Sequence, residues 1–403
     1  MMADSFAPDP LDGARVVLAV TGSIAAYKAP ELARHLRAAG AEVQVILSEG
    51  GAHFTTPMAL QAVAGHPVRT TLLDPAEEAG MDHIALAHWA DLLLVAPTSA
   101  DSLARLAQGR ADDLLGAVYL ATAAPVRLAP AMNHRMWAHP ATQRNAATLR
   151  EDGAGLLGPG EGDQACGESG PGRMLEPEAL VVHARRALSP RPLSGRRILV
   201  TAGPPHEPLD PVRYLGNRSS GKMGYALAQA AWELGAQVTL VSGPTALADP
   251  EGLETLRVTT AAEMAAAVRA RLAGTDLLVA AAAVSDHRPA ETDEHKRKGK
   301  DPFQLALVTN PDILAEAAAT EPGPATLGFA AETEQVLDHA RAKRADKGVD
   351  YLAVNDVTET GAGFGTDTNR VTLLGPDGEQ ALPAGTKLAV ARELLTRIAA
   401  ALG

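Results

Sequence analysis

The strongest constraint on the fold is a pattern that occurs twice: an apolar run ending in a glycine turn, then a helical stretch, then a second apolar run. In the first copy the three parts are residues 15–20, 25–38 and 41–47. In the second copy they are residues 197–202, 224–234 and 236–241. Strand, helix and parallel strand in this order form a βαβ unit. The chain therefore belongs to the α/β class, whether the two copies reflect duplication or only shared architecture.

The length and the linker composition divide this chain into two halves. Its 403 residues suffice for two or three domains at roughly 150 residues each. Prolines and small residues interrupt the pattern near residue 190. We predict a disordered leader at 1–12, a first domain at 13–188, a linker at 189–195 and a second domain at 196–403. Each domain should be doubly wound and Rossmann-like, with a mainly parallel sheet whose strands bind ligands beyond their carboxyl ends.

Composition excludes several classes of protein. With 36 basic and 48 acidic residues the net charge is −12, which argues against a nucleic-acid or membrane-surface partner. The longest apolar run, residues 277–284, is far short of the roughly 20 residues that span a bilayer. No signal peptide is visible, and the single cysteine excludes an intramolecular disulfide. We expect a cytoplasmic protein.

The turn after the first apolar run has the features of an anion site. Gly22, Ser23 and Ile24 open a helix, where free N–H groups attract phosphate. Ser48 follows the next run and could add a hydroxyl, although both serines are equally ordinary helix caps. The G-x-G-x-x-G pattern of dinucleotide sites is missing, so a mononucleotide fits better.

Three further segments of the first half carry reactive side chains. His83 stands near the start of a predicted helix, and Asn133 follows a strand-like run within 130–137. Cys166 lies in a Gly/Pro-rich loop, 158–173, of the kind that often forms a lid. The alternatives are a packed histidine, a helix cap and an incidental thiol.

Together these segments resemble a known family, the cysteine-decarboxylating flavoproteins, which include phosphopantothenoylcysteine decarboxylase. The resemblance rests on Gly22-Ser23, residues 96–101, the P-x-M-N-x-x-M-W motif at 130–137 and the cysteine loop. It implies His83 as active-site base, Asn133 as the group that recognises the substrate carboxylate, and Cys166 as the acid on a mobile flap. It also implies an FMN site formed by Gly22, Ser23, Ile24, Ser48, Pro97, Thr98, Ser99 and Met132.

The second half contains a false P-loop. Residues 216–222 fit G-x-x-x-x-G-K, but Met223 replaces the Ser or Thr that would hold magnesium. A proline-broken loop also precedes them where a P-loop requires a strand. Basic residues recur at 295–300 and at Lys343 and Lys347, four residues apart. One interpretation is that these basic residues form a solvated face. The alternative is a polyphosphate site, because two lysines four residues apart on a helix repel each other unless a negative group lies between them.

Four motifs in this half resemble phosphopantothenate–cysteine ligase, and they lie at 201–204, 209–214, 219–224 and 328–333. With the first half, the chain resembles the bacterial bifunctional family from about Gly13 onward. The resemblance implies that Asn217 helps to turn over an acyl-cytidylate with Arg213 beside it, and that Lys296 meets the nucleotide or this intermediate. It implies a CTP site at Ala280, Ala281, Ala282, Asp286, Lys296, Pro311, Asp312, Ile313, Leu314, Phe329, Lys343 and Lys347. The family's usual K-x-K-K ends here in Gly299, and whether Lys300 replaces the missing lysine is open.

The implied function is a two-step synthesis. CTP, with Mg²⁺ on its phosphates, activates 4'-phosphopantothenate for ligation with L-cysteine; the metal ligands are not assigned. FMN then takes two electrons from the cysteinyl thiol side, so that CO2 can leave, and returns them to give 4'-phosphopantetheine. The family also implies a homo-oligomer, with a trimer-based flavoprotein core and ligase dimers.

Two other functions compete with this one. An NAD(P)- or flavin-dependent oxidoreductase is disfavoured by the missing G-x-G-x-x-G turns. A nucleotide-sensing protein without turnover is disfavoured by the reactive groups His83, Asn133, Cys166 and Lys296 in separate segments.

Overall fold

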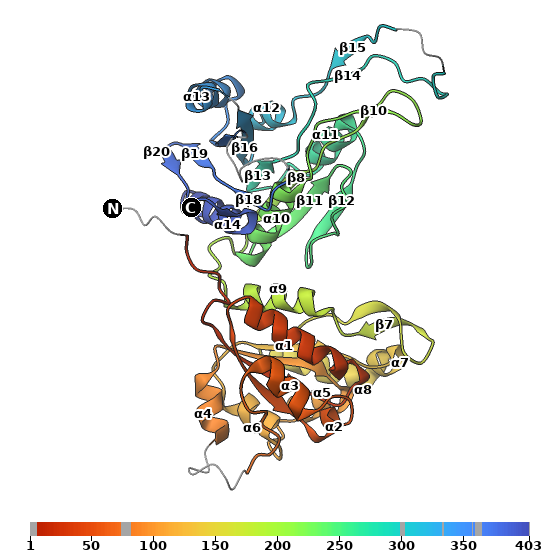
Figure 1. Cartoon of the computed structure of the whole chain (residues 1–403), viewed down its shortest axis with the longest axis vertical. Helices are drawn as coiled ribbons and strands as arrows, with labels where there is room; N and C mark the ends of the chain where they lie inside the picture. Colours follow the sequence, from red (N-terminus) through yellow and green to blue (C-terminus); the bar gives the residue numbers. More distant parts are fainter. Residues whose placement is uncertain are drawn as a thin grey trace. The chain divides into compact units, whose positions relative to one another are not determined.

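The computed structural model describes residues 6–73, 82–298, 303–332, 334–356, 358 and 365–402. The chain divides into two compact units (Figure 1). We call Pro8–Ser189 the first unit and Pro190–Gly403, together with Met1–Ala7, the second unit. Within the described residues, no helix combines the length and apolar content needed to cross a bilayer.

The first unit is built on five parallel strands in the order β2-β1-β3-β4-β5. The strands are β1 (Arg15–Val20), β2 (Glu42–Leu47), β3 (Leu92–Thr98), β4 (Val126–Pro130) and β5 (Gly155–Leu156). An antiparallel hairpin of β6 (Gly160–Asp163) and β7 (Ser169–Arg173) follows β5. The helices are η1 (Ile24–Lys28), α1 (Ala29–Ala38), α2 (Glu49–Ala52), α3 (Pro57–Ala64), α4 (Asp82–Trp89), α5 (Ala100–Ala107), α6 (Leu114–Ala121), α7 (His134–Ala138), α8 (Pro140–Glu151) and α9 (Pro177–Leu188).

Alternate residues of β1 pack on opposite faces of this sheet. Val16, Leu18 and Val20 share a buried cluster with residues of α1, α3 and α9. Val17 and Ala19 belong to a second cluster with residues of α4, α5, α6 and α8. Helices therefore cover both faces, which confirms the doubly wound α/β class predicted from the continuous apolar runs.

Two details of the first unit differ from the expectation. Leu11 is fully buried and Asp9 accepts a hydrogen bond from Arg185 Nε at 3.0 Å, so this part of the expected leader is ordered. The helix expected from residue 25 starts as the 3₁₀ helix η1, and α1 begins only at Ala29. Pro30 lies at the start of α1, and because proline lacks the N–H, it cannot continue α-helical bonding from the preceding turn.

The second unit has an eight-stranded sheet in the order β12-β11-β8-β13-β16-β17-β19-β20. It is parallel from β12 to β17, whereas β19 and β20 are antiparallel. Its strands are β8 (Arg197–Ala202), β11 (Gln237–Ser242), β12 (Glu254–Arg257), β13 (Leu277–Ala280), β16 (Ala325–Glu332), β17 (Tyr351–Asp356), β19 (Thr372–Gly375) and β20 (Gly378–Ala381). Its helices are α10 (Lys222–Glu233), α11 (Ala261–Arg269), α12 (Ile313–Ala318), α13 (Val336–Lys347) and α14 (Lys387–Ala399).

Short strand pairs lie outside this sheet. They are β9 (Glu207–Pro208) with β10 (Tyr214–Leu215), β14 (His287–Pro289) with β15 (Leu307–Thr309), and β18 (Thr368–Asn369) with β21 (Gly385–Thr386). The β14–β15 pair projects from the sheet as an arm (Figure 1). The apolar run expected to continue to residue 284 ends as a strand at Ala280. Beyond it, Ala281 and Ala283 donate their N–H groups to the carbonyls of Thr201 and Gly203, so the chain stays beside the end of β8 after its pairing with β16 has ended.

A buried ion pair joins α10 to α14. Arg392 Nη2 donates to Glu233 Oε2 at 2.7 Å, and the Glu233 side chain is completely buried. Removing Arg392 takes a cationic partner from a carboxylate in the interior, which is far more costly than losing an exposed pair.

We expect Arg392→Met to destabilise the second unit by about 3–5 kcal/mol. Arg269→Met is the matched control because it removes a 2.7 Å pair to Glu316 between half-exposed side chains, and we expect a loss of at most about 1 kcal/mol. Hydrogen exchange of the α10 and α14 amides in increasing urea measures both. Equal effects of the two variants would contradict the buried pair's role.

Candidate functional site

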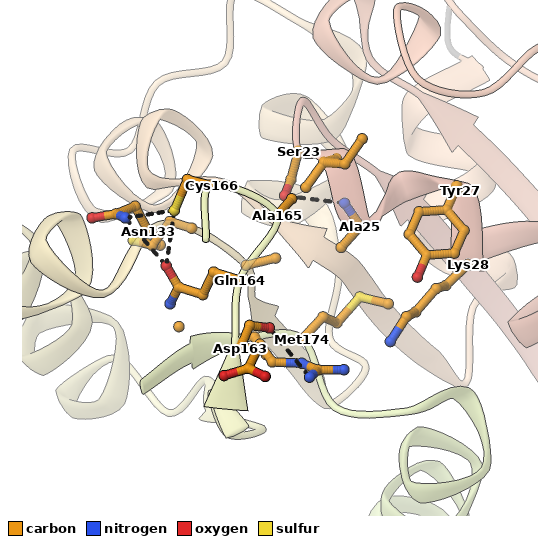
Figure 2. Close-up of a pocket in the computed structure, with 15 residues that line it drawn as sticks. Ser23, Ala25, Tyr27, Lys28, Asn133, Asp163, Gln164, Ala165, Cys166 and Met174 are labelled. Carbon is orange, nitrogen blue, oxygen red and sulfur yellow. Dashed lines mark hydrogen bonds between the residues drawn. The ribbon is translucent and has the colours of Figure 1, made fainter. Parts of the chain in front are cut away.

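A cavity of about 340 Å³ opens at the carboxyl edge of the first sheet. Three segments enclose it: the turn between β1 and η1, residues 131–133 after β4, and the β6–β7 hairpin with its connecting loop. Figure 2 shows Cys166, Asn133 and Gln164 gathered on one side, and Tyr27 and Lys28 on the other. The cavity is lined by Ser23, Ile24, Ala25, Tyr27, Lys28, Ala131, Met132, Asn133, Asp163, Gln164, Ala165, Cys166, Gly172, Arg173 and Met174.

A close backbone contact fixes the hairpin against β4. The Met132 N–H donates to the Gly172 carbonyl at 2.9 Å. A Cβ on Gly172 would lie 2.3 Å from the Met132 carbonyl oxygen, and the Gly172 φ of +157° is disfavoured for other residues. Only glycine therefore allows the hairpin to close over residues 131–133. This role of Gly172 was not predicted, although the Gly-Pro-Gly stretch at 170–172 could have signalled it.

Asn133 and Cys166 meet on the inner side of the hairpin. Asn133 Nδ2 lies 3.4 Å from Cys166 Sγ, 3.2 Å from Gln164 Oε1 and 2.6 Å from Glu168 Oε2. The Cys166 thiol in turn lies 3.6 Å from the same Glu168 oxygen. The hydrogen bond from Asn133 lowers the pKa of Glu168, although partial desolvation opposes it, and Arg135 adds to the lowering. The structure thus brings together an amide donor, a thiol and a carboxylate.

The cavity combines apolar walls with polar and charged groups, Lys28, Asp163 and Arg173 among them. Ile24, Met132 and Met174 supply apolar surface, and Ser23 caps η1 by accepting from the Ala25 N–H at 3.4 Å. Gly22 lies so close to Gly50 that a Cβ would be 3.1 Å from the Gly50 Cα. A planar, largely apolar ring with a polar tail fits such a lining. The residues therefore fit a flavin mononucleotide.

Other predicted cofactor residues lie at the ends of β2 and β3 but do not line the cavity. Ser48 caps α2 by accepting from Gly51, and Ser99 caps α5 by accepting from Ser102. Thr98 is fully buried and donates to the Val95 carbonyl at 2.8 Å. Pro97 follows a cis peptide bond and its carbonyl accepts from Thr21. The hydrogen bonds of these four residues cap helices or hold the backbone in place.

His83 lies apart from this cavity in its own chain. It stands in the first turn of α4, which packs beside α6, as the hydrogen bond from Thr122 Oγ1 to the Ala87 carbonyl shows. Figure 1 places α4 on the opposite side of the first unit from α7 and β7. Within the described part of the chain, its buried Nδ1 has no hydrogen-bond partner. A single chain therefore does not bring His83 to Cys166.

The second unit has a cavity of about 140 Å³ at the carboxyl ends of β13 and β16. It brings together Ala281, Ala282 and Phe329 of the predicted CTP set with the loop 219–221 and the start of α10. The preceding segment is the β9–β10 hairpin, not a strand of the central sheet, as expected for a loop that only imitates a P-loop. Its lining also includes Asn355, Asn369 and Lys387, for which the sequence offered no signal.

Asn217 and Arg213 do not themselves line this cavity. Asn217 Nδ2 donates to the carbonyls of Ala283 and Val284, both at 3.2 Å. Arg213 donates to the buried carboxylate of Asp210 at 2.6 Å and to the Arg297 carbonyl at 3.3 Å. The hydrogen bond from Arg213 holds the pKa of Asp210 far below its usual value. Arg213 therefore fastens the β9–β10 hairpin to the segment that carries Lys296.

Some of the remaining CTP residues gather at α12, and the others lie on separate segments. Asp312 caps α12 and accepts from Lys347 Nζ at 2.8 Å. Burial alone would raise the pKa of Asp312, but hydrogen bonds from Lys347 and the Ala315 N–H lower it. Ile313 and Leu314 are buried in the interior, so their side chains serve packing. Ala280 ends β13, while Asp286 and Lys296 are exposed, Lys343 is half-exposed on α13, and Pro311 precedes the cap. Gly299, Lys300 and Thr333 lie outside the described residues.

Each half of the chain matches a known protein family. A family model described as "Flavoprotein" matches residues 5–189, and one described as "DNA/pantothenate metabolism flavoprotein C-terminal domain" matches residues 193–402. The coenzyme A biosynthesis bifunctional protein CoaBC of Vibrio vulnificus strain YJ016 is 49% identical over 98% of this chain and 99% of its own length. That of Escherichia coli strain K12 is 47% identical over 96% and 97%. The crystal structure of a CoaBC C-terminal domain is 39% identical, covers 53% of this chain and 98% of its own, and has a TM-score of 0.46.

We expect Gly172→Ala to release the β6–β7 hairpin from residues 131–133, because overpacking costs about 1–3 kcal/mol and each 1.4 kcal/mol is tenfold. Hydrogen exchange of the Met132 amide should accelerate about tenfold. Gly167→Ala is the control: its φ is also positive, at +82°, but nothing lies within 4 Å of its Cβ. Unchanged Met132 exchange in Gly172→Ala would contradict the proposed contact.

Proposed function

Since this chain belongs to the family of the coenzyme A biosynthesis bifunctional protein CoaBC, we propose that the first unit holds the decarboxylase site and the second unit the ligase site. As a member of that family, the chain is a phosphopantothenate–cysteine ligase and a phosphopantothenoylcysteine decarboxylase. The first unit is the flavoprotein half. We propose FMN as its flavin, bound in the 340 Å³ cavity.

The contact between Asn133 and Cys166 carries the proposal for the first unit. Asn133 recognises the substrate carboxylate, and the 2.6 Å contact of its amide nitrogen with the Glu168 carboxylate supports this role. Cys166, 3.4 Å from the same amide, is close enough to protonate the carbon that the carboxylate leaves. Bound FMN would take up two electrons from the substrate and return them. Met132 and Met174 keep water from the reacting carbon.

His83 would act as the base from another copy of the chain. The distance of His83 from the cavity within one chain supports this proposal. Two apolar side chains at the cavity rim also support it, because Ile24 is 55% exposed and Tyr27 is 61% exposed. In the second unit, Val212 and Tyr214 in the β9–β10 hairpin and Phe303 in the connection between β14 and β15 are also exposed. We therefore propose a homo-oligomer that uses both apolar surfaces.

In the second unit we propose CTP-dependent activation of 4'-phosphopantothenate, followed by attack of the L-cysteine amine. Mg²⁺ would bridge phosphate oxygens, and Lys296, Lys343 and Lys347 would neutralise charge on them. Lys347 already contacts a carboxylate, Asp312. Asn217, which is hydrogen-bonded to the loop after β13, would face the acyl-cytidylate. Joined in this order, the two reactions lead to 4'-phosphopantetheine.

Cys166→Ser should release CO2 but stall before the saturated thiol, because a serine hydroxyl is a much weaker acid than a thiol. Parallel assays of CO2 and of product thiol, with phosphopantothenoylcysteine as substrate, measure the two steps. Ligation by the second unit of the same variant is the internal control and should be unchanged. A variant that forms saturated thiol at the wild-type rate would exclude Cys166 from this role.

Asn217→Asp should release pyrophosphate at a higher rate than it forms amide, because a carboxylate cannot donate to the Ala283 and Val284 carbonyls or to the intermediate. We expect about tenfold or more imbalance between pyrophosphate and amide product, the scale of a lost charge-assisted hydrogen bond. Decarboxylation of added phosphopantothenoylcysteine is the control for intact protein. If both products fell in equal proportion, Asn217 would have no separate role in amide formation.

A further inference from the structure

The side-chain amide of Asn133 is already occupied by contacts within the chain. Its Oδ1 accepts the Arg135 N–H at 2.9 Å as the N-cap of α7, which fixes the direction in which Nδ2 points. An amide nitrogen carries two N–H groups. Gln164 Oε1 lies 3.2 Å from this nitrogen, Glu168 Oε2 lies 2.6 Å from it, and Cys166 Sγ, a weaker acceptor, lies 3.4 Å from it. A substrate carboxylate that binds Asn133 must therefore displace one of these acceptors.

Gln164 is the less exchangeable of the two oxygen acceptors. Its Oε1 also accepts the His134 N–H at 3.1 Å, and its Nε2 donates to the Gly170 carbonyl at 3.5 Å. The Gln164 N–H donates to the Glu168 carbonyl at 2.7 Å, so the backbone of Glu168 is held as well. The Glu168 side chain, however, is 40% exposed. Rotation of this one side chain is the smallest change that releases an N–H of Asn133.

Two side-chain nitrogens of α7 lie beside the Glu168 carboxylate. Arg135 Nη2 is 3.5 Å from Oε1, and His134 Nδ1 is 3.6 Å from Oε2. In the part of the chain that the structure describes, this buried His134 nitrogen has no hydrogen-bond partner. A shift of about 0.5 Å would bring Oε2 within hydrogen-bond range of it. Leaving Asn133 therefore does not leave the carboxylate of Glu168 unpaired.

We propose that Glu168 is a built-in competitor of the substrate carboxylate, which holds an N–H of Asn133 until the substrate displaces it toward Arg135 and His134. This inference rests on the proposed decarboxylase function, in which Asn133 recognises that carboxylate. Glu168 does not itself line the cavity, so it takes the N–H from outside the space that the substrate enters. Because CO2 carries no charge, Glu168 regains the contact after decarboxylation. Glu168 acts through Asn133 and is a positioning residue.

The test compares two ligands that differ only in the carboxylate. One is 4'-phosphopantothenoyl-L-serine, whose hydroxyl replaces the thiol that is oxidised, and the other is 4'-phosphopantothenoylethanolamine, which lacks the carboxylate. Calorimetry with the full chain and its bound flavin measures both without turnover. We expect Glu168→Gln to bind the serine ligand about tenfold more tightly, the scale of a charge-assisted hydrogen bond, because a neutral amide competes less for Asn133. The ethanolamine ligand should bind the wild type and the variant equally.

Glu161→Gln is the matched control, because it removes the same charge from an exposed position on β6 of the same hairpin. It should bind both ligands like the wild type, and Glu168→Ala should show the same gain as Glu168→Gln. If Glu168 served only to hold the hairpin, its loss would weaken both ligands, and that result would overturn the proposal. Unchanged affinity for the serine ligand in both Glu168 variants would overturn it too.

Variants of Asn133 distinguish failure of this inference from failure of the proposed function. In a chain with Asn133→Ala, adding Glu168→Gln should no longer improve binding of the serine ligand, because both side chains act on one contact. A gain that persists without Asn133 contradicts the competition. If Asn133→Ala in the Glu168→Gln chain left the affinity for the serine ligand unchanged, the carboxylate-binding role of Asn133 itself would be wrong. An effect of Asn133→Ala without any effect of Glu168→Gln refutes only the inference about Glu168.

Discussion

Close approach of main chain to main chain at the carboxyl ends of the strands determines both candidate sites. A Cβ on Gly51 would lie 2.6 Å from the Val20 carbonyl, and one on Gly172 would lie 2.3 Å from the Met132 carbonyl. In the second unit, Gly224 allows α10 to contact β8 at Ala202. Since glycine alone fits at these contacts, the loops that carry Ser23, Asn133 and the α10 N-terminus have little freedom. The functional side chains are positioned by backbone packing before any ligand arrives.

The sequence predicted the elements whose signal is local. Continuous apolar runs bounded by glycine identified β1, β2, β8 and β11, because a strand covered on both faces needs no polar alternation. It did not predict the end of β13 at Ala280. Apolarity continues to Val284, but pairing with β16 ends at Ala280, and only the hydrogen bonds to the end of β8 continue. Such a change depends on neighbouring strands, and no window of sequence contains it.

The same distinction applies to the sites. Asn133 and Cys166 could be singled out from their motifs, and the structure brings them together across 33 residues. The participation of Glu168 depends on the turn of the hairpin, which residue types alone do not fix. No sequence pattern pointed to Lys387 as part of the second cavity. It lies 165 residues from Lys222, and its position is that of the first charged residue of an amphipathic helix. Arg213 was expected beside an intermediate, yet its side chain holds Asp210.

The two cavities share a position in the fold but differ in the reactive groups that line them, and the difference matches the chemistry of each half. In the first unit, the apolar side chains of Ile24, Met132 and Met174 share the lining with the Asn133 amide and the Cys166 thiol, which suit recognition of a carboxylate and delivery of a proton. In the second unit, the lining includes Lys222 and Lys387 and, within the described residues, no Asp or Glu, so this cavity favours anionic groups. One cavity could not serve both reactions well. Fusing two α/β units keeps the two electrostatic environments apart while the chain still supplies both activities.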